Sequence, residues 1–308
     1  MNNHTKKSSR VYPASIRKNK GKKYNAFDVF LIIFLGIVSL IAVTPFYVVV
    51  ITSFASEKSI LMNGYALWPE AFSLKAYEYV LGPTSTVYSS YLVTIVITVC
   101  GTIGGLIVTS LYAYVCSRRN LKYSNRLSII AYIPVVFNGG MVSFYMVLVN
   151  LRFQNSIWGL IIPMLVAPMN VFLMKNYFLG LPESVVESAK IDGASPSRIY
   201  AKIIMPMSTP VIATVGLFIA LQYWNEWFLP LLLVSDSKLY PLQFLLRQIM
   251  ARVSYSQSQS AGVMTAGSMP QESLKMATVV VTIGPIIFLY PFVQRFFVKG
   301  ITIGAVKG

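Results

Sequence analysis

Long apolar stretches constrain the fold of this chain more than any other feature. Six of them reach the roughly 20 residues that a helix needs to cross a bilayer. They cover residues 29–51, 90–116, 127–149, 156–174, 210–234 and 276–298. Hydrocarbon offers no hydrogen-bond partners to the backbone, so such segments must satisfy their own N–H and C=O groups as helices. The sequence therefore predicts an all-α integral membrane protein with six transmembrane helices.

Composition agrees with this prediction. Hydrophobic residues make up 55% of the 308 residues, and charged residues only 12%. Soluble globular proteins have about twice that charged fraction, roughly a quarter. Several prolines lie inside the apolar stretches, but membrane helices tolerate proline where neighbouring groups satisfy the freed carbonyls. The prolines therefore do not exclude helical spans.

The placement of Lys and Arg predicts the orientation in the membrane. Residues 1–26 contain eight of the 26 basic residues and no acidic residue. Most of the others follow the second, fourth and sixth apolar stretches. Because cytoplasmic segments are enriched in Lys and Arg, both termini are expected in the cytoplasm of a multi-pass plasma-membrane protein. The tail is too polar for a signal peptide, and contact with anionic lipid accounts for its charge.

Other function classes fit poorly. The basic tail has no aromatic interleaving and no recognisable nucleic-acid module, so we expect no nucleic-acid partner. Gly21-Lys22-Lys23 lacks the upstream glycine of a phosphate-binding loop, so the chain is not expected to be an enzyme that hydrolyses nucleotide. His4 is the only histidine, which excludes a His-based catalytic or zinc site. We expect no metal or cofactor in this chain.

Residues 183–206 form a polar island between the fourth and fifth apolar stretches. Gly193 is placed to end a first helix, because glycine adopts the left-handed conformation without a Cβ clash. Ser195-Pro196 is a favourable cap and first-turn pair for a second helix, which would end near Pro206. A helix-turn-helix loop is therefore predicted. By itself, it is equally compatible with a simple surface link between two spans.

The spacing within this loop resembles the cytoplasmic coupling loop of ABC importer permeases. The family pattern is Glu-Ala-Ala, three residues, Asp-Gly-Ala, and about nine residues later Ile-x-Leu-Pro. This chain departs from it only in conservative ways, at Ser188 and Met205. The resemblance implies that the loop inserts into a groove of a separate ATPase subunit. The implied coupling residues are Glu187, Ala189, Asp192, Gly193, Ala194 and Pro206.

Further segments resemble the carbohydrate-uptake, maltose-type branch of these binding-protein-dependent permeases. Residues 222–230 are similar to the branch's Trp-Asn-Glu-Phe stretch, with Trp227 in place of phenylalanine. Residues 297–308 are similar to its C-terminal ending, and 137–141 to a Gram-positive subgroup linked to complex oligosaccharides. The resemblance covers residues 27–308 as one permease domain and leaves 1–26 as a basic cytoplasmic tail.

This resemblance implies a set of partners. They are a second, unlike permease subunit, two ATPase subunits that bind ATP and magnesium, an extracellular solute-binding lipoprotein and an oligosaccharide substrate. The outer loops 53–89 and 235–275 are candidate landing surfaces for the binding protein, although flexible connection explains the Ser/Gln-rich run 254–260 better. Two alternatives stay open. One is an importer of a non-sugar solute, and the other is a membrane subunit for assembly or signalling.

Polar residues inside apolar stretches are candidates for the substrate pathway, because burying them against lipid is costly. Asn138 begins an Asn-Gly-Gly break near the middle of the third stretch, where transporters often open a helix to line a cavity. A second group lies near the outer half of the fifth stretch. The candidate pathway residues are Asn138, Gln222, Tyr223, Asn225 and Glu226. Interhelical hydrogen bonding or packing is the competing interpretation for each.

Overall fold

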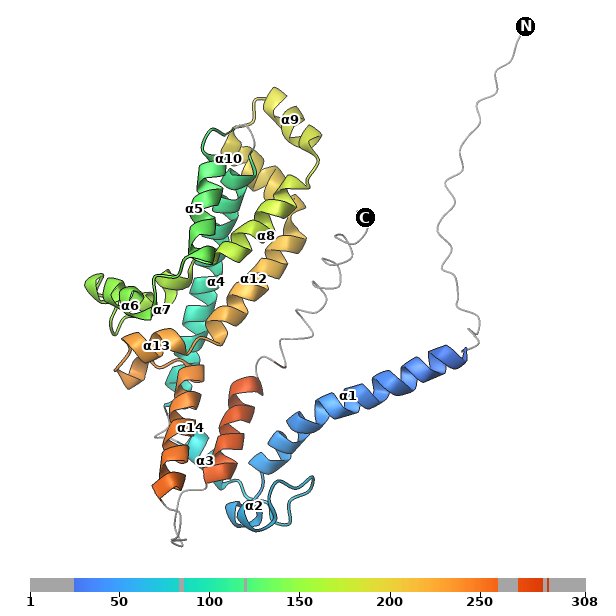
Figure 1. The fold of residues 1–308 in the computed structure, drawn as a ribbon, viewed down its shortest axis with the longest axis vertical. Helices are drawn as coiled ribbons and strands as arrows, with labels where there is room; N and C mark the ends of the chain where they lie inside the picture. The colour runs from blue at the N-terminus through green and yellow to red at the C-terminus, as the bar shows by residue number, and fades with distance from the viewer. Residues whose placement is uncertain (1–24, 83–85, 119–120, 260–270, 285–286, 288–308) are drawn as a thin grey trace. The chain divides into compact units, whose positions relative to one another are not determined.

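The computed structural model describes residues 25–82, 86–118, 121–259, 271–284 and 287. In these ranges the regular elements are helices (Figure 1). Contacts divide the chain into two units, residues 1–47 and 48–308. Apart from Asn25, the described part of the first unit belongs to helix α1 (Ala26–Ser53), which continues into the second unit. At about 1.5 Å per residue, this 28-residue apolar helix is long enough to cross a bilayer, which agrees with the first predicted span.

The central helix of the second unit is α4 (Val87–Ser117), which has 31 residues and contains the second predicted span. Helices α5, α8, α12 and α14 all contact it. Gly101 and Gly105 lie on α4 against the side chains of Tyr223 and Ile219 of α12. Small residues let membrane helices approach closely and gain packing contacts, which explains why α4 and α12 form the main helix pair of this unit.

The third predicted span, residues 127–149, is not one continuous helix. Helix α5 (Ser124–Val136) and helix α6 (Met141–Asn150) meet at 119°. The Asn138 side chain accepts a hydrogen bond from the Gly140 N–H at 2.9 Å, and Gly140 has φ +81°, a conformation that favours glycine. The break predicted at Asn-Gly-Gly is therefore present, and it is sharp enough for either a broken span or a re-entrant segment.

The fourth predicted span is also divided. Helix α7 (Ile157–Ile161) continues into the 3-10 turn η1 (Ile162–Met164) and, after a bend of 45°, into α8 (Pro168–Leu179). Pro163 and Pro168 lie at this bend; since proline removes a backbone donor, it interrupts helical hydrogen bonding there.

The chain then forms a compact hairpin of short helices. They are α9 (Glu183–Ile191), α10 (Pro196–Ile199), the π-helical turn η2 (Tyr200–Ile204) and α11 (Met205–Met207). An 84° bend leads into α12 (Thr209–Trp224). The fifth predicted span, 210–234, differs from the structure, because α12 ends at Trp224 and a separate helix α13 (Phe228–Leu233) follows a turn.

Short helices occupy the end of this unit opposite α9 and α10 (Figure 1). They are α2 (Glu57–Asn63), α3 (Lys75–Leu81) and the longer α14 (Leu242–Gln259), which the 3-10 turn η3 (Ser237–Leu239) precedes in the chain. Residues 271–284 are helical as well. Only this first part of the sixth predicted span, 276–298, is well described; most of the remainder lies outside the described residues.

One carboxylate fixes the start of the helix at 271–284. Glu57 accepts hydrogen bonds from the backbone N–H groups of Glu272 and Ser273, at 2.9 and 3.0 Å, and from the Ser273 hydroxyl. Tyr65 donates to Glu272 at 2.7 Å. This hydrogen bond, together with burial and the nearby carboxylates, raises the pKa of Tyr65 to about 12, so its hydroxyl remains a donor at neutral pH.

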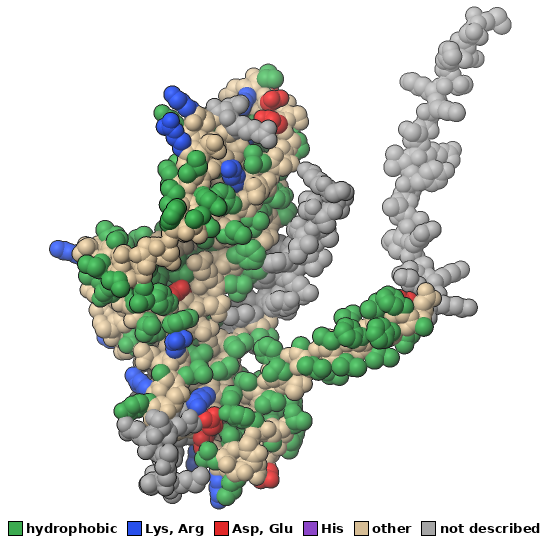
Figure 2. All heavy atoms as spheres, in the orientation of Figure 1, with side chains coloured by type: hydrophobic (Ala, Val, Ile, Leu, Met, Phe, Trp, Pro, Cys, Tyr) green, Lys and Arg blue, Asp and Glu red, His purple; other side chains and the backbone are tan. Residues whose placement is uncertain are grey.

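Among the described residues, α1 and α4 are uninterrupted helices long and apolar enough to cross a membrane. Counting each of three bent pairs as one span raises the total to five. The prediction of six spans therefore remains a prediction. In Figure 2, hydrophobic side chains cover α1 and much of the middle of the second unit, whereas Lys and Arg gather nearer its two ends. Apolar surface of this extent suits lipid and partner helices.

Candidate functional site

Helix α9 ends in a Schellman motif built from Asp192, Gly193 and Ala194. The Gly193 N–H donates to Lys190 O at 3.0 Å, and the Ala194 N–H donates to Ala189 O at 2.9 Å. Gly193 has φ +74°. These bonds satisfy carbonyls at the helix end, and the left-handed residue reverses the chain toward α10. The Asp-Gly-Ala triplet therefore has a local structural role: it sets the turn.

The second half of the hairpin begins at Ser195, whose hydroxyl accepts a hydrogen bond from the Arg198 N–H at 3.3 Å. Pro196 occupies the first helical position, where its missing N–H has no intrahelical partner to lose. The helix widens into the π-helical turn η2 and then includes Pro206, an exposed residue that lies two residues before the 84° bend at Ser208. Pro206 thus lies where the hairpin joins α12.

The hairpin has an inner and an outer face. Val186, Ala189, Ile199 and Ile204 are buried, and they share one hydrophobic core with α4, α8 and α12. Of the remaining predicted coupling residues, Ala194 is half-buried against this core. The other predicted coupling residues are exposed; they are Glu187, Asp192, Gly193 and Pro206. The outer face of the hairpin therefore presents the carboxylates of Glu187 and Asp192.

Aromatic residues fasten the hairpin to the end of α4. The hydroxyl groups of Tyr200 and Ser110 lie 2.7 Å apart, and the Tyr114 hydroxyl donates to Pro196 O at 3.2 Å. The two tyrosine rings also pack with their centroids 5.1 Å apart. These contacts join residues that are separated by more than 80 positions in the sequence. They hold the hairpin against α4.

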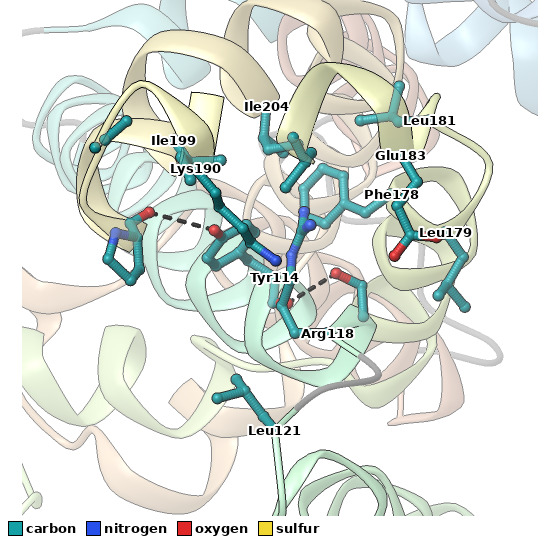
Figure 3. A pocket seen from close by; sticks show the side chains of 15 residues that line it. Tyr114, Arg118, Leu121, Phe178, Leu179, Leu181, Glu183, Lys190, Ile199 and Ile204 are labelled. Atoms are coloured by element: carbon teal, nitrogen blue, oxygen red, sulfur yellow. Dashed lines mark hydrogen bonds between the residues drawn. The ribbon is translucent and has the colours of Figure 1, made fainter. Parts of the chain in front are cut away.

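A pocket of about 520 Å³ remains between the hairpin and the ends of α4 and α8 (Figure 3). Its wall is mainly apolar, with Phe178 and Val186 among the lining residues. Figure 3 shows the Arg118 and Lys190 side chains pointing toward its middle. The Arg118 guanidinium also lies 4.4 Å from the centroid of the Tyr114 ring. The hairpin is therefore attached to α4 along one side and borders this pocket along another.

The predicted pathway residues of the fifth stretch have different surroundings. Tyr223 is fully buried, its hydroxyl donates to Ile161 O at 2.7 Å, and its ring lies against Gly101. In this conformation Tyr223 has no surface for a substrate and packs α12 against α4. Gln222, one residue earlier, is exposed.

Asn225 and Glu226 lie at the junction between α12 and α13. The Asn225 side chain donates to Leu221 O at 2.8 Å and accepts from the Gln243 amide at 3.2 Å. Glu226 Oε1 accepts from the backbone N–H groups of Phe228 and Leu229, both at 2.7 Å. Glu226 therefore caps the N-terminus of α13, where a negative charge is favourable.

Asn138 is exposed, and the hydrogen bond described for its side chain is the local one to the Gly140 N–H. The structure thus brings Gln222, Asn225 and Glu226 together, while Asn138 lies at the separate α5–α6 break. In the described part of the chain, no group of three or more His, Cys, Asp or Glu residues is placed to hold a metal ion.

Comparison with known proteins identifies the family. Residues 101–303 match the model of the binding-protein-dependent transport system inner membrane component. This chain belongs to that family. As a family member it is a multi-pass protein of the plasma membrane, and the matched region includes both the hairpin and the α12–α14 junction.

Two relatives of Bacillus subtilis (strain 168) match this inner membrane component over nearly its whole length. The polygalacturonan/rhamnogalacturonan transport system permease protein YtcP is 38% identical over 286 residues, covering 93% of this chain and all of that protein. Protein LplC is 39% identical over 287 residues, covering 93% of this chain and 97% of that protein.

A solved structure shares the fold of this inner membrane component. It is the crystal structure of a bacterial ABC transporter involved in the import of the acidic polysaccharide alginate. One of its chains superposes with a TM-score of 0.77 at 26% identity, covering 90% of this chain and all of that one. YtcP is named as a permease protein of a transport system and not as an enzyme.

Sequence reasoning missed several contacts of this family member. No local sequence signal predicts that the hairpin is attached through Tyr114, Tyr200 and Ser110. Aromatic residues near the end of a span are nevertheless compatible with such a role. Sequence reasoning also missed Arg247, whose guanidinium lies 3.7 Å from the centroid of the Trp227 ring. The departure at Trp227 from the family's phenylalanine is the one signal that marked this position.

Proposed function

We propose that this chain is one permease subunit of a binding-protein-dependent ABC importer for oligosaccharides. It forms half of the translocation pathway with a second, unlike permease, and two separate ATPase subunits bind ATP and magnesium. The observation that supports this most is the hairpin itself, whose inner face belongs to the transmembrane core and whose outer face is exposed and charged.

The coupling step follows from the two faces. Glu187 and Asp192 present carboxylates to a groove of the ATPase, where charge-assisted hydrogen bonds hold the hairpin. When the ATPase subunits close, the hairpin moves with them. Tyr200 and Ser110 pass this displacement to α4, and buried Val186 and Ala189 pass it to α8 and α12.

The same hydrophobic core extends from Ala189 in the hairpin to Tyr223 near the far end of α12. Packed cores rearrange between discrete arrangements rather than deform continuously, so a hairpin displacement shifts α12 as a unit. The pocket of about 520 Å³ beside the hairpin supplies room for this shift. Tyr223 thus serves as a packing link in the proposed mechanism.

The predicted pathway residues other than Tyr223 fall into two roles, contact with the sugar and positioning of the backbone. Gln222 and Asn225 offer exposed amide groups that can hydrogen-bond to sugar hydroxyls, and Asn138 offers another at the α5–α6 break. Glu226 is a positioning residue, because it caps α13 and so fixes the backbone next to Asn225.

The hairpin and both termini are proposed to lie in the cytoplasm. Helices α2, α3 and α14 occupy the opposite end of the second unit (Figure 1), which would face the extracellular solute-binding lipoprotein. Loops 53–89 and 235–275 are then the candidate landing surfaces for that protein. Their connection through Glu57 and Glu272 would present them as one surface.

Reconstitution tests the proposed function. The chain is assembled in proteoliposomes with its second permease, ATPase and binding protein, identified from neighbouring reading frames, and uptake of labelled oligosaccharides is measured. Because YtcP is named for polygalacturonan and rhamnogalacturonan, and the alginate importer for an acidic polysaccharide, the panel must contain acidic and neutral glycans. ATP-dependent uptake of any of them supports the proposal. An assembled complex that carries no saccharide but imports another solute overturns it.

A further inference from the structure

The junction between α12, α13 and α14 holds a cationic group that the proposed coupling mechanism does not use. Arg247 on α14 is exposed, and its guanidinium lies 3.7 Å from the centroid of the half-buried Trp227 ring. Cation–π contact of this kind holds the flat face of the guanidinium against the indole and leaves its N–H edge directed elsewhere. The arrangement therefore orients a planar set of donors at the surface.

No ion pair occupies these donors in the described part of the chain, where the salt bridge is Lys275–Glu272. Glu226 is the acidic residue next to Trp227 in sequence, but its Oε1 accepts two backbone N–H groups of α13. The positive charge of Arg247 thus has no described carboxylate partner. An exposed, oriented and uncompensated guanidinium is suited to an external anion.

Amide groups lie beside this cation. Gln243 precedes Arg247 by four residues on α14, so the two side chains project from the same face of the helix. Gln243 donates to Asn225 at 3.2 Å, and Asn225 follows α12 two residues before Trp227. One surface therefore presents an indole, a guanidinium and two amides, drawn from α14 and from the turn between α12 and α13.

These groups match one class of ligand. A guanidinium binds a carboxylate through two parallel hydrogen bonds, and amides bind hydroxyl groups. A uronic acid carries both a carboxylate and ring hydroxyls, whereas a neutral sugar lacks the carboxylate. We propose that Arg247, oriented by Trp227, selects uronic-acid-containing oligosaccharides as the cargo. This inference rests on the proposed function, because it names the substrate class of the same pathway.

The test compares a substrate that carries carboxylates with its uncharged methyl ester. Trigalacturonate and its methyl ester have the same sugar skeleton, and the ester has no carboxylate. Their ATP-dependent uptake by the complete importer is measured for the wild type and for Arg247→Gln, in phosphatidylcholine proteoliposomes prepared with and without phosphatidylglycerol. The quantity compared is the ratio of acid uptake to ester uptake. The same binding protein delivers both substrates to both proteins, so its selectivity cancels when the ratio of the variant is divided by that of the wild type.

Arg247→Gln is expected to lower the acid-to-ester ratio about tenfold, the effect of losing one charge-assisted hydrogen-bonded pair. Arg247→Lys, which keeps the charge without the bidentate geometry, should fall between the variant and the wild type. Arg252→Gln is the matched control. It removes an exposed arginine from the same helix, about 140° around its axis, and should leave the ratio unchanged.

Three results would overturn the inference. One is an unchanged ratio in Arg247→Gln with uptake of both substrates intact. Another is an equal loss for acid and ester, which would indicate a structural role. The third is a defect confined to vesicles that contain phosphatidylglycerol, which would assign Arg247 to anionic lipid. Failure of the wild type to carry any saccharide would instead reject the proposed function, and the inference with it.

Discussion

The hydroxyl groups of Ser110 and Tyr200 lie 2.7 Å apart and join the interior of α4 to the first residue of the π-helical turn within the hairpin. Ser110 is almost fully buried, and its hydroxyl also donates to Ile107 O, so the contact ends inside the helix bundle. A movement of the hairpin therefore has a direct polar connection to α4, in addition to the hydrophobic core.

Removing this connection should weaken coupling without preventing assembly. Tyr200→Phe deletes the hydroxyl and keeps the ring that packs on Tyr114, at a cost of about 1 kcal/mol. We expect fewer substrate molecules transported per ATP hydrolysed. Ser110→Ala should have the same effect, and the double variant should be no worse than either single one, because all three lose one interaction. Strictly additive defects would contradict a shared contact.

The close approach of α4 and α12 depends on Gly101. A Cβ atom at this position would collide with the ring of Tyr223, which is fully buried. Gly101→Ala should therefore lower the thermal stability of the purified protein, by about 1–3 kcal/mol as in other overpacked cores. Gly139→Ala is the matched control, because no atom beyond its two chain neighbours lies within 4 Å of its added Cβ. Equal stability of the two variants would show that the helix pair accommodates the extra methyl group.

Glu57 is expected to hold the outer loops together through its bonds to Glu272 and Ser273. Glu57→Ala removes every acceptor and leaves helical N–H groups without this partner, so hydrogen exchange of residues 271–275 should accelerate. Glu57→Gln keeps one side-chain oxygen and should retain part of the protection. Unchanged exchange in Glu57→Ala would mean that water replaces the carboxylate at no cost.

The proposed orientation can be tested by cysteine labelling of intact cells. In a background without Cys100 and Cys116, Ser197→Cys in the hairpin should be shielded from an impermeant thiol reagent. Glu70→Cys, in the loop that contains α2, should react. Both positions are exposed in the structure, so burial does not explain a difference between them. Labelling of Ser197→Cys from outside would reverse the orientation and remove the hairpin from reach of the ATPase.

Local signals account for the turn between α9 and α10. Gly193 after α9 and Ser195-Pro196 before α10 act through bonds that span a few residues, so their spacing in the sequence specifies the turn. Asn138 and Gly140 predicted a break for the same reason. The size of the bend at this break was not predictable, because it depends on what α5 and α6 each pack against.

Long-range contacts explain the remaining differences. Tyr223 was predicted as a pathway residue from its depth in the fifth stretch, but its environment is set by Gly101 and Ile161, which are distant in sequence. Glu226 was read as an intramembrane charge, whereas the end of α12 at Trp224 makes it a helix cap. Periodicity gives no signal for where one apolar run divides into two helices.

The central claim is that the hairpin turn couples ATP hydrolysis to transport, and Gly193 is its most direct test. At φ +74°, a β-branched side chain is strained by about 1–2 kcal/mol or more, so Gly193→Val should distort the Schellman turn. Asparagine tolerates this conformation, which makes Gly193→Asn the matched control.

The deciding measurement is uptake and ATP hydrolysis by the same proteoliposomes that contain the complete importer. We expect Gly193→Val to insert and fold but to lose most transport per ATP hydrolysed, whereas Gly193→Asn should retain it. Wild-type uptake in Gly193→Val, at an unchanged rate of ATP hydrolysis, would contradict the account.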